Sequence, residues 1–300
     1  MKTILLTGAS GFVGSYFREK YAGDYNIRTF SFLHDNLEAL HVKGVDVVFH
    51  LSALVHQMGG ADEEEYERVN VTQTVELAKK AKRNGVRQFV FMSTVKVYGE
   101  ENDVPYTEMT TCKPEDAYGK SKLKAEKELQ KLEDENFIVS IVRTPIVYGY
   151  GVKANIKNLI SLVEKVPVLP FGKINNKRSM VYVGNLCYIV DAVIQQQKRG
   201  VFLAADMEAL STTRLVELIA DALDKKVYLV RVPFFESLLK LVKPSFHKRL
   251  YGSLEVDNTQ TMKRLFGEAK ASLPKSGETE VLLPFSVEEG VWLMIHGKTT

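Results

Sequence analysis

Three glycines between a predicted strand and a predicted helix constrain this chain more than any other feature of its sequence. Residues 3–7 form a run rich in leucine and β-branched side chains, and residues 12–21 have helical spacing. In the turn between them, Gly8 permits a tight bend, Gly11 lets the backbone approach a pyrophosphate, and Gly14 lets the helix pack closely on the strand. The free N–H groups of the helix N-terminus also favour phosphate. A tight turn without a ligand has the same glycines, but this placement favours dinucleotide binding.

Short apolar runs then alternate with helical stretches as far as about residue 150. The segment 45–53 (VDVVFHLSA) is almost continuously apolar, as a strand buried on both faces should be. The alternation predicts a Rossmann-type doubly wound parallel sheet with helices on both faces and right-handed crossovers. The further predicted strands are 27–33, 88–93 and 138–143, and the further predicted helices are 63–84 and 115–135.

The pattern changes after about residue 150, where helices mix with short strands and prolines become more frequent. The predicted helices are 155–165, 212–223 and 235–242, the predicted strands are 201–205 and 227–232, and the segment 286–289 (SVEE) has a capping-box pattern. We expect an NAD(P)-binding domain over residues 1–150, to which residues 177–197 return. A smaller α/β substrate domain over residues 151–300 is expected at the carboxyl edge of the sheet.

Composition excludes several classes of protein. Of the 300 residues, 40 are Lys or Arg and 37 are Asp or Glu, a balance that argues against a dedicated nucleic-acid or membrane binder. The two cysteines, Cys112 and Cys187, lie far apart, which argues against a disulfide scaffold or a metal site. No apolar run approaches the roughly 18 residues of a membrane helix. We therefore expect a cytoplasmic protein without metal, nucleic-acid or membrane partners.

The next feature is the residue that distinguishes NAD from NADP. The ribose of NAD is usually held by an acidic residue about 20 positions after the glycines. Here the second predicted strand ends in Ser31, Phe32 and Leu33, and Asp35 lies slightly beyond, where it reaches the adenine or caps a helix. The missing acid leaves NAD and NADP open and favours tolerance of NADP.

Tyr118 and Lys122 lie four residues apart, on one face of a predicted helix. A tyrosine has a pKa of about 10, and a cation one turn away favours the phenolate, so the pair is suited to acid–base work. An exposed helix face has the same spacing by chance. However, Ser93 and Thr94 close the preceding predicted strand, at the edge of the sheet where ligands bind. Glycine turn, strand-end hydroxyl and Tyr-x-x-x-Lys together form a strong pattern.

On these motifs the chain resembles the extended short-chain dehydrogenases/reductases of the nucleotide-sugar epimerase/dehydratase group. The likeness runs essentially from end to end and is narrowest with members from bacterial polysaccharide pathways. The matching stretches are GASGFVG (8–14), HLSALVHQ (50–57), RVNVTQT (68–74), STVKVYGE (93–100), YGKSK (118–122), RTPIVYGYGVKAN (143–155), RSMVYVGNL (178–186) and the closing SLEVDNTQT and PFSVEEG.

The resemblance implies roles for individual positions. The implied catalytic residues are Thr94, Tyr118 and Lys122. The implied cofactor-binding residues are Gly8, Ser10, Gly11, Phe12, Val13, Gly14, Leu51, Ser52, Ala53, Asn70, Ser93, Tyr118, Lys122, Pro145 and Val147. The implied substrate-binding residues are Thr94, Lys96, Asn155, Arg178 and Arg249, with Arg178 on a diphosphate, to which a guanidinium can bind bidentately.

The resemblance further implies hydride transfer at C4 of a UDP-linked sugar. It favours a 4-reductase that acts on UDP-4-keto sugars of the N-acetylquinovosamine or fucosamine type. A redox-neutral UDP-hexose 4-epimerase is the alternative, and a non-catalytic dinucleotide-binding module is the alternative from another class. Two departures are the short stretch between the second strand and HLSA, which points to a trimmed helix and strand, and Gly184-Asn185 in place of an acidic residue, which we interpret as structural.

Two further features allow more than one interpretation. His50 ends a predicted strand, where a histidine that satisfies a neighbouring polar group is more common than a catalytic one. His56 and Gln57 follow the strand tip and suit a substrate loop or a plain loop equally. The apolar residues of the segment 234–246 form a subunit interface, compatible with a homodimer, or part of a domain core.

Overall fold

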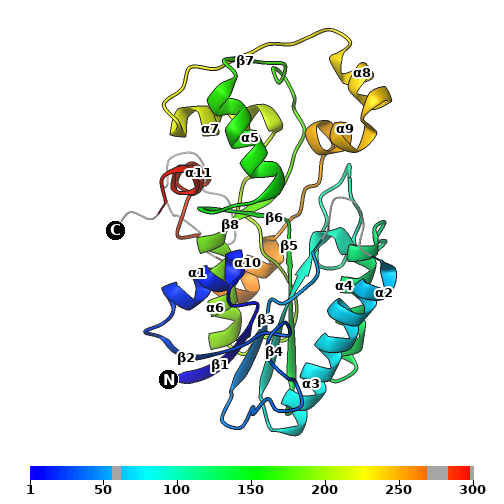
Figure 1. Ribbon diagram of the computed structural model, residues 1–300, viewed down its shortest axis with the longest axis vertical. Helices are drawn as coiled ribbons and strands as arrows, with labels where there is room; N and C mark the ends of the chain where they lie inside the picture. The colour runs from blue at the N-terminus through cyan, green and yellow to red at the C-terminus, as the bar shows by residue number, and fades with distance from the viewer. Residues whose placement is uncertain (56–61, 269–282, 298–300) are drawn as a thin grey trace.

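The computed structural model describes residues 1–55, 62–268 and 283–297 (Figure 1). Its centre is a six-stranded parallel sheet with the strand order β2-β1-β3-β4-β5-β9. Because the order reverses beside β1, the crevice where ligands bind in such sheets lies at the ends of β1 and β3. The predicted doubly wound Rossmann-type sheet is confirmed. Its strands are β1 Lys2–Thr7, β2 Tyr25–Phe30, β3 Val47–His50, β4 Gln88–Thr94, β5 Ile138–Thr144 and β9 Gly200–Leu203.

Helices cover both faces of this sheet, and each face has its own hydrophobic core. Alternate strand residues point to opposite faces, so Ile4 and Leu6 belong to one core and Leu5 to the other. Helices α1 Phe12–Lys20 and α6 Val183–Gln195 pack together on the first side, with α10 Thr259–Phe266 against α6. On the second side lie α2 Glu63–Tyr66, η1 Glu67–Thr72, α3 Gln73–Arg83 and α4 Ala117–Gln130.

A second group of elements lies beyond the carboxyl ends of the strands of the six-stranded sheet (Figure 1). The chain enters it where β5 ends and β6 begins. It has two small parallel sheets, β6 Ile146–Tyr148 with β8 Met180–Tyr182, and β7 Val168–Leu169 with β10 Tyr228–Leu229. Its helices are α5 Ala154–Lys165, α7 Thr212–Ala222, α8 Phe235–Val242, α9 Pro244–Tyr251 and α11 Val287–His296. The predicted capping box at the start of α11 is present, with Ser286 and Glu289 each bonded to the other's backbone N–H.

Three predicted elements differ from the expectations, and the segment between β2 and β3 agrees with them. The strand expected at 201–205 with the second half of the chain is β9, which pairs with β5 in the main sheet. Residues 31–46, between β2 and β3, hold no helix or strand, in line with the trimmed segment expected there. The expected strand 227–232 shortens to the two residues of β10. The expected continuous helix 63–84 contains the π-helical segment η1.

A buried polar cluster joins β6, β8, β9 and α6. The carboxylate of Asp206, just after β9, accepts from the Tyr148 hydroxyl at 2.7 Å and from the Asn185 amide at 2.8 Å. Asn185 also pairs through its amide with the backbone of Phe285. Asn185 is therefore structural, as expected, and its acidic partner comes from the segment that follows β9. Among the described residues, no helix is long and apolar enough to cross a bilayer.

Candidate active site

The glycine turn between β1 and α1 has the close approaches that its sequence predicts. Gly8 adopts a φ of 68°, and a Cβ there would lie 3.0 Å from the Ser52 backbone N. A Cβ on Gly14 would lie 2.3 Å from the Gly8 carbonyl oxygen, so this side of α1 admits only glycine. Gly11 is the N-cap of α1, and no side chain caps the helix. The turn thus leaves backbone N–H groups for an anion, with Ser10 and Gly11 exposed.

A buried hydrogen-bond relay joins this turn to the end of β3. The Thr7 hydroxyl accepts from the backbone N–H groups of Leu51 and Ser52, both at 3.1 Å, and lies 2.8 Å from His50 Nδ1. His50 Nε2 lies 2.9 Å from the Thr74 hydroxyl. Since Thr7 already accepts twice, it donates to Nδ1, and Nε2–H donates to Thr74. His50 is therefore a neutral, positioning histidine that shapes the backbone at 51–53, where cofactor contacts were expected.

His50 makes the stability of the fold depend on pH. Burial, and next the charge of Lys122, lower the pKa of His50 to about 3. Because an unfolded histidine titrates near 6.5, its contribution to stability is complete above that pH and is lost as pH falls toward 3. We expect the free energy of unfolding in urea to drop by about 2 kcal/mol more between about pH 7.5 and about pH 5 than in His50→Gln. His34→Gln, at an exposed histidine, should keep the wild-type dependence; an unchanged dependence in His50→Gln would contradict the assignment.

Asn70 lies in η1, and its amide is fully engaged with neighbouring protein groups. Its oxygen accepts from the Leu54 N–H at 2.7 Å, and its nitrogen donates to the Leu54 carbonyl at 2.9 Å and to the Ser121 hydroxyl at 3.0 Å. Asn70 therefore anchors the strand-end loop to α4. A cofactor contact by Asn70, which the resemblance implies, stays a prediction, and the predicted loop residues His56 and Gln57 lie outside the described residues.

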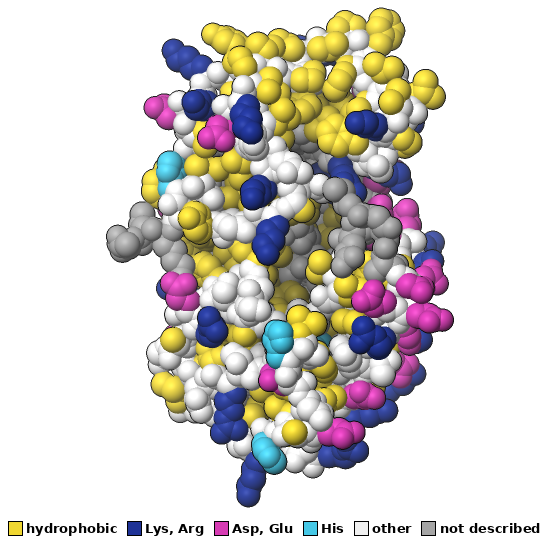
Figure 2. Space-filling view, viewed as in Figure 1, with side chains coloured by type: hydrophobic (Ala, Val, Ile, Leu, Met, Phe, Trp, Pro, Cys, Tyr) yellow, Lys and Arg dark blue, Asp and Glu magenta, His cyan; other side chains and the backbone are white. Residues whose placement is uncertain are grey.

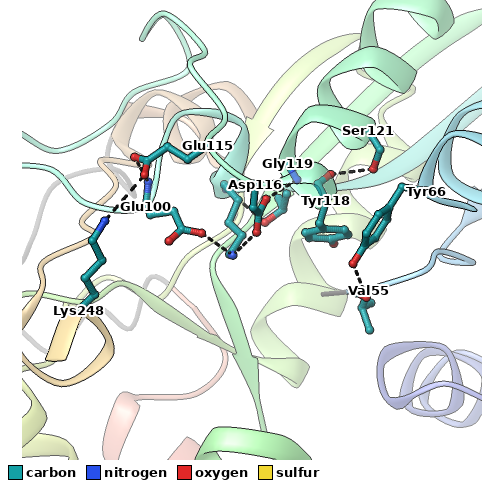
Figure 3. A network of polar contacts seen from close by, with 11 residues as sticks. Val55, Tyr66, Glu100, Glu115, Asp116, Tyr118, Gly119, Ser121 and Lys248 are labelled. Atoms are coloured by element: carbon teal, nitrogen blue, oxygen red, sulfur yellow. Dashed lines mark hydrogen bonds and ion pairs between the residues drawn. The ribbon is translucent and has the colours of Figure 1, made fainter. Parts of the chain in front are cut away.

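The first turn of α4 is fixed to the end of β4, which brings Thr94 beside the helix that carries Tyr118 and Lys122. Asp116 caps α4 by accepting from the Gly119 N–H and binds the Lys96 ammonium at 2.5 Å (Figure 3). A Cβ on Gly119 would lie 2.8 Å from the Lys96 carbonyl oxygen, so glycine is required for this approach. Buried Thr94 caps the 3-10 turn η2 Val95–Val97. The predicted catalytic residues thus share one edge of the sheet.

Tyr118 differs electrostatically from the sequence-based expectation. Burial raises the pKa of its phenol above the usual value, and the charge of Asp116 and then the neighbouring Tyr66 raise it further. The Tyr66 and Tyr118 rings lie 6.4 Å apart between centroids, and Tyr66 donates to the Val55 carbonyl (Figure 3). The expected lowering of this pKa by Lys122 is therefore wrong for these surroundings. Tyr118 is held as a neutral phenol, ready to donate a proton.

Lys122 explains why the expected effect is absent. Its ammonium lies 3.9 Å from the centroid of the Phe91 ring, and its side chain is only 2% exposed. Burial lowers the pKa of Lys122 to about 7, against the opposing effect of Glu126. At neutral pH the lysine is therefore divided between its charged and neutral forms, and it is a weak stabiliser of a phenolate until further negative charge enters the site.

A buried ion pair behind the site was missed by sequence reasoning. Glu126, 1% exposed and one turn after Lys122, accepts from the Ser93 hydroxyl and from Arg143 Nε and Nη2 at 3.0 and 2.5 Å. Arg143 also donates to the Tyr98 hydroxyl at 2.7 Å. This cluster ties α4 to β4 and β5. The available signal was the i,i+4 spacing of Lys122 and Glu126, which continues the helix face of Tyr118.

The predicted substrate residues fall into two places. The Lys96 ammonium donates to the carboxylate of Asp116 and, at 2.9 Å, to the carboxylate of Glu100. Its charge is therefore balanced within the protein. Arg249 donates to the exposed Asn155 at 3.4 Å. Arg178 donates to the Gly252 carbonyl at 3.1 Å, and its pKa is lowered by burial, raised by nearby glutamates and lowered again by the charge of Arg249. Two guanidinium groups and an amide therefore gather near α9.

Of the predicted nicotinamide neighbours, Pro145 lies between β5 and β6 and Val147 lies within β6, and both are half-buried. A Cβ on the adjacent Gly149 would lie 3.3 Å from the Phe12 ring, so this segment closely approaches the N-terminus of α1. The glycine turn and β6 thus border the same region. Figure 2 shows the surface hollowed between the two halves of the molecule. Among described residues, no group of three His, Cys, Asp or Glu side chains could hold a metal ion.

Comparisons with known proteins agree with this arrangement. Residues 4–204 match the model of the "NAD dependent epimerase/dehydratase family". The chain is 38% identical over 296 residues to "UDP-glucose 4-epimerase" of Vibrio cholerae, covering 88% of this chain and 90% of that protein. It is 25% identical over 308 residues to "N-acetyl-alpha-D-glucosaminyl-diphospho-ditrans,octacis-undecaprenol 4-epimerase" of Escherichia coli O157:H7, covering 96% of this chain and 92% of the relative.

Solved structures share the fold at lower sequence identity. UDP-glucuronic acid 4-epimerase from Bacillus cereus, solved in complex with NAD, superposes with a TM-score of 0.74 and 19% identity. That match covers 98% of this chain and 97% of the other chain. UDP-N-acetylglucosamine 4-epimerase from Methanobrevibacter ruminantium superposes with a TM-score of 0.72 and 21% identity, covering 98% and 97% of the two chains.

Proposed function

The chain belongs to the NAD dependent epimerase/dehydratase family, and from this premise we propose that it is a redox-neutral UDP-hexose 4-epimerase. The observation that supports the proposal is that Thr94 ends β4 against α4, which carries Tyr118 and Lys122, at the same edge of the sheet as the glycine turn. The Vibrio cholerae relative, with most of both chains matched, supports epimerisation over net reduction. The family assignment also speaks against a non-catalytic dinucleotide module.

In this proposal the residues of the first half position the cofactor and the sugar. The glycine turn and α1 N-terminus bind the pyrophosphate, the backbone at 51–53 borders the ribose, and Pro145 and Val147 flank the nicotinamide. The nicotinamide supplies the acceptor and then the donor of the C4 hydride. The close approaches at Gly8 and Gly14 fit a dinucleotide, since they shape an uncapped helix N-terminus open to phosphate.

Tyr118 exchanges the proton at the sugar O4, and the Thr94 hydroxyl hydrogen-bonds the same oxygen. Because Tyr118 is mainly protonated, oxidation proceeds from its minor phenolate form, which takes the O4 proton as the C4 hydride leaves. The 4-keto sugar then receives the proton back from Tyr118 and the hydride on its other face. Lys122 orients Tyr118 through the shared helix face and gains its full charge as negative charge develops at O4. Arg178 and Arg249 are proposed to hold the diphosphate of the UDP-sugar, because guanidinium groups bind phosphate oxygens bidentately.

A substrate panel tests the proposal directly. Purified chain with catalytic amounts of NAD is expected to equilibrate UDP-glucose-type and UDP-galactose-type sugars, with no net change of absorbance from reduced nicotinamide. Products are separated by anion-exchange chromatography, and a Tyr118→Phe chain is the control. Stoichiometric consumption of reduced cofactor by UDP-4-keto sugars, with no interconversion of hexoses, would instead identify the 4-reductase.

The connection after β2 leads to a prediction about cofactor choice. Asp35 accepts from the Ser31 N–H at 2.7 Å, so its carboxylate closes a turn rather than a helix. Without an acidic residue at the end of β2, we expect NADP and NAD to bind within about tenfold of each other. Ser31→Asp should weaken NADP at least about tenfold by repulsion of the 2′-phosphate, measured by fluorescence titration, while Asn36→Asp, with the same charge change nearby, should not. A large preference of the unmodified chain for NAD would defeat the prediction.

A further inference from the structure

Helix α8 is apolar on two sides, although only one of them meets the protein. Phe235 and Leu239 pack against the main hydrophobic core. Phe234, Leu238 and Leu241 recur at the helical spacing of another face and are 86%, 60% and 82% exposed. A helix with large apolar side chains on both sides is normally covered on both sides. The outer side of α8 is therefore a surface that lacks its cover.

This surface continues past the end of the helix. Val242 is exposed at the end of α8, Phe246 is exposed on α9, and Val232 is exposed just before α8. We call these residues, with Phe234, Leu238 and Leu241, the apolar face. Figure 2 shows hydrophobic side chains gathered at the upper end of the molecule, where Figure 1 places α8. Exposed apolar patches of this kind mark sites of protein or membrane interaction.

Positive charge surrounds the apolar face. Between residues 230 and 250 the chain has five Lys or Arg residues and one acidic residue, Glu236. Lys248 is paired with Glu101 and Glu115. Three others have no ion-pair partner among the described residues, namely Arg231, Lys240 and Lys243. The charge of the whole chain is nearly balanced, so this local excess of positive charge does not appear in the composition. The prediction from composition therefore excluded a membrane surface.

We propose that the apolar face docks on an anionic lipid bilayer, with α8 lying in the headgroup layer. A short helix with leucine and phenylalanine on one side and lysine beside them has the composition of interfacial helices. Its eight residues are far too few to span a bilayer, so it lies on the surface. Lys240 and Lys243 then contact acidic headgroups while the apolar side chains enter the acyl boundary.

The same charges argue against a second copy of this chain as the cover. A two-fold interface places one patch against the identical patch of its partner. Lys240 and Lys243 of both copies would then approach each other with only Glu236 to offset them, and like charges across an interface are unfavourable. A negatively charged lipid surface removes this conflict, because it complements the cations and also buries the apolar side chains.

Vesicle sedimentation with the full chain tests the proposal. The chain is expected to sediment with vesicles of phosphatidylcholine and phosphatidylglycerol at low salt, and at least about tenfold less with phosphatidylcholine alone or at high salt. Leu238→Ser with Leu241→Ser should weaken binding about tenfold or more. Leu33→Ser, at a leucine that is 87% exposed elsewhere, is the matched control and should bind normally.

Charge reversal separates specific docking from general attraction. Lys240→Glu with Lys243→Glu should weaken binding by about thirtyfold, whereas Lys20→Glu with Lys79→Glu has the same net charge and should bind as the unmodified chain does. Thermal unfolding verifies that all variants remain folded. Equal losses in both charge variants, or no binding to anionic vesicles, would overturn the proposal. A dimer in sedimentation velocity that dissociates on Leu238→Ser with Leu241→Ser would assign the apolar face to a second copy instead.

Discussion

Replacement of Tyr118 by phenylalanine is expected to lower kcat for UDP-hexose interconversion by about 10²–10⁴-fold, the usual contribution of a positioned acid–base group. The phenylalanine keeps the ring beside Tyr66 and removes only the hydroxyl, so KM should change little. Loss of the hydroxyl removes the group that takes the O4 proton during oxidation and returns it during reduction, and the raised pKa makes the protonated phenol its dominant form. Steady-state kinetics with chromatographic separation of the sugars measures the effect.

The matched control is Tyr66→Phe. Tyr66 belongs to the same aromatic pair, but its hydroxyl donates to the Val55 carbonyl at 3.3 Å and not to a reacting group. We expect its kcat to stay within a few-fold of the unmodified chain. Full turnover by Tyr118→Phe, with a folded chain and bound cofactor, would remove Tyr118 from the mechanism.

Replacement of Glu126 by alanine is expected to lower the free energy of unfolding by about 3–5 kcal/mol, because Arg143 would remain buried without its counter-charge. Both side chains of this ion pair are almost inaccessible, at 1% and 6% exposed. Exposed ion pairs have far weaker effects. Glu128→Ala, two residues further along α4, breaks the exposed pair with Lys131 and should leave stability within measurement error.

Urea unfolding of the two variants at neutral pH makes this comparison. The double variant Glu126→Leu with Arg143→Met should recover much of the lost stability, because it removes both charges together. A similar loss in Glu126→Ala and Glu128→Ala would show that the buried pair contributes no more than a surface one. Since Glu126 also bonds Ser93, we expect the single variant to lose activity even where it is folded.

The sequence was informative where local patterns determine structure. The glycine turn and the apolar runs of β1, β3, β4 and β5 predicted the parallel sheet, because strands buried on both faces leave a continuous apolar signal. The capping box at Ser286 was visible for the same local reason. The pairing of β9 with β5 was not predictable, because a short apolar strand fits either half of the chain and only tertiary pairing decides between them.

At the candidate site, too, local patterns predicted some features and tertiary contacts determined the others. Thr94, Tyr118 and Lys122 could be placed together because the order of strand end and helix fixes their common edge. The pKa of Tyr118 could not be predicted from spacing, since it depends on burial and on Asp116, whose position follows from its contacts with Lys96 and Gly119. The spacing of Lys122 and Glu126 places Glu126 on the helix face of the site, but no helical or strand periodicity identifies Arg143, on the next strand, as its partner.

The π-helical turn η1 has a consequence for the loop after β3. Such a turn accommodates one residue more than an α-helix of the same path, so deletion of exposed Thr72 would restore a regular helix. Residues on either side of the deletion would keep their places on the helical path, and only the widened turn that holds Asn70 would close. Asn70 would then swing away from Leu54, and a more regular helix would release the loop that it now restrains. A more regular helix would thus cost the segment after β3, at the edge of the crevice, its hydrogen bonds to Asn70.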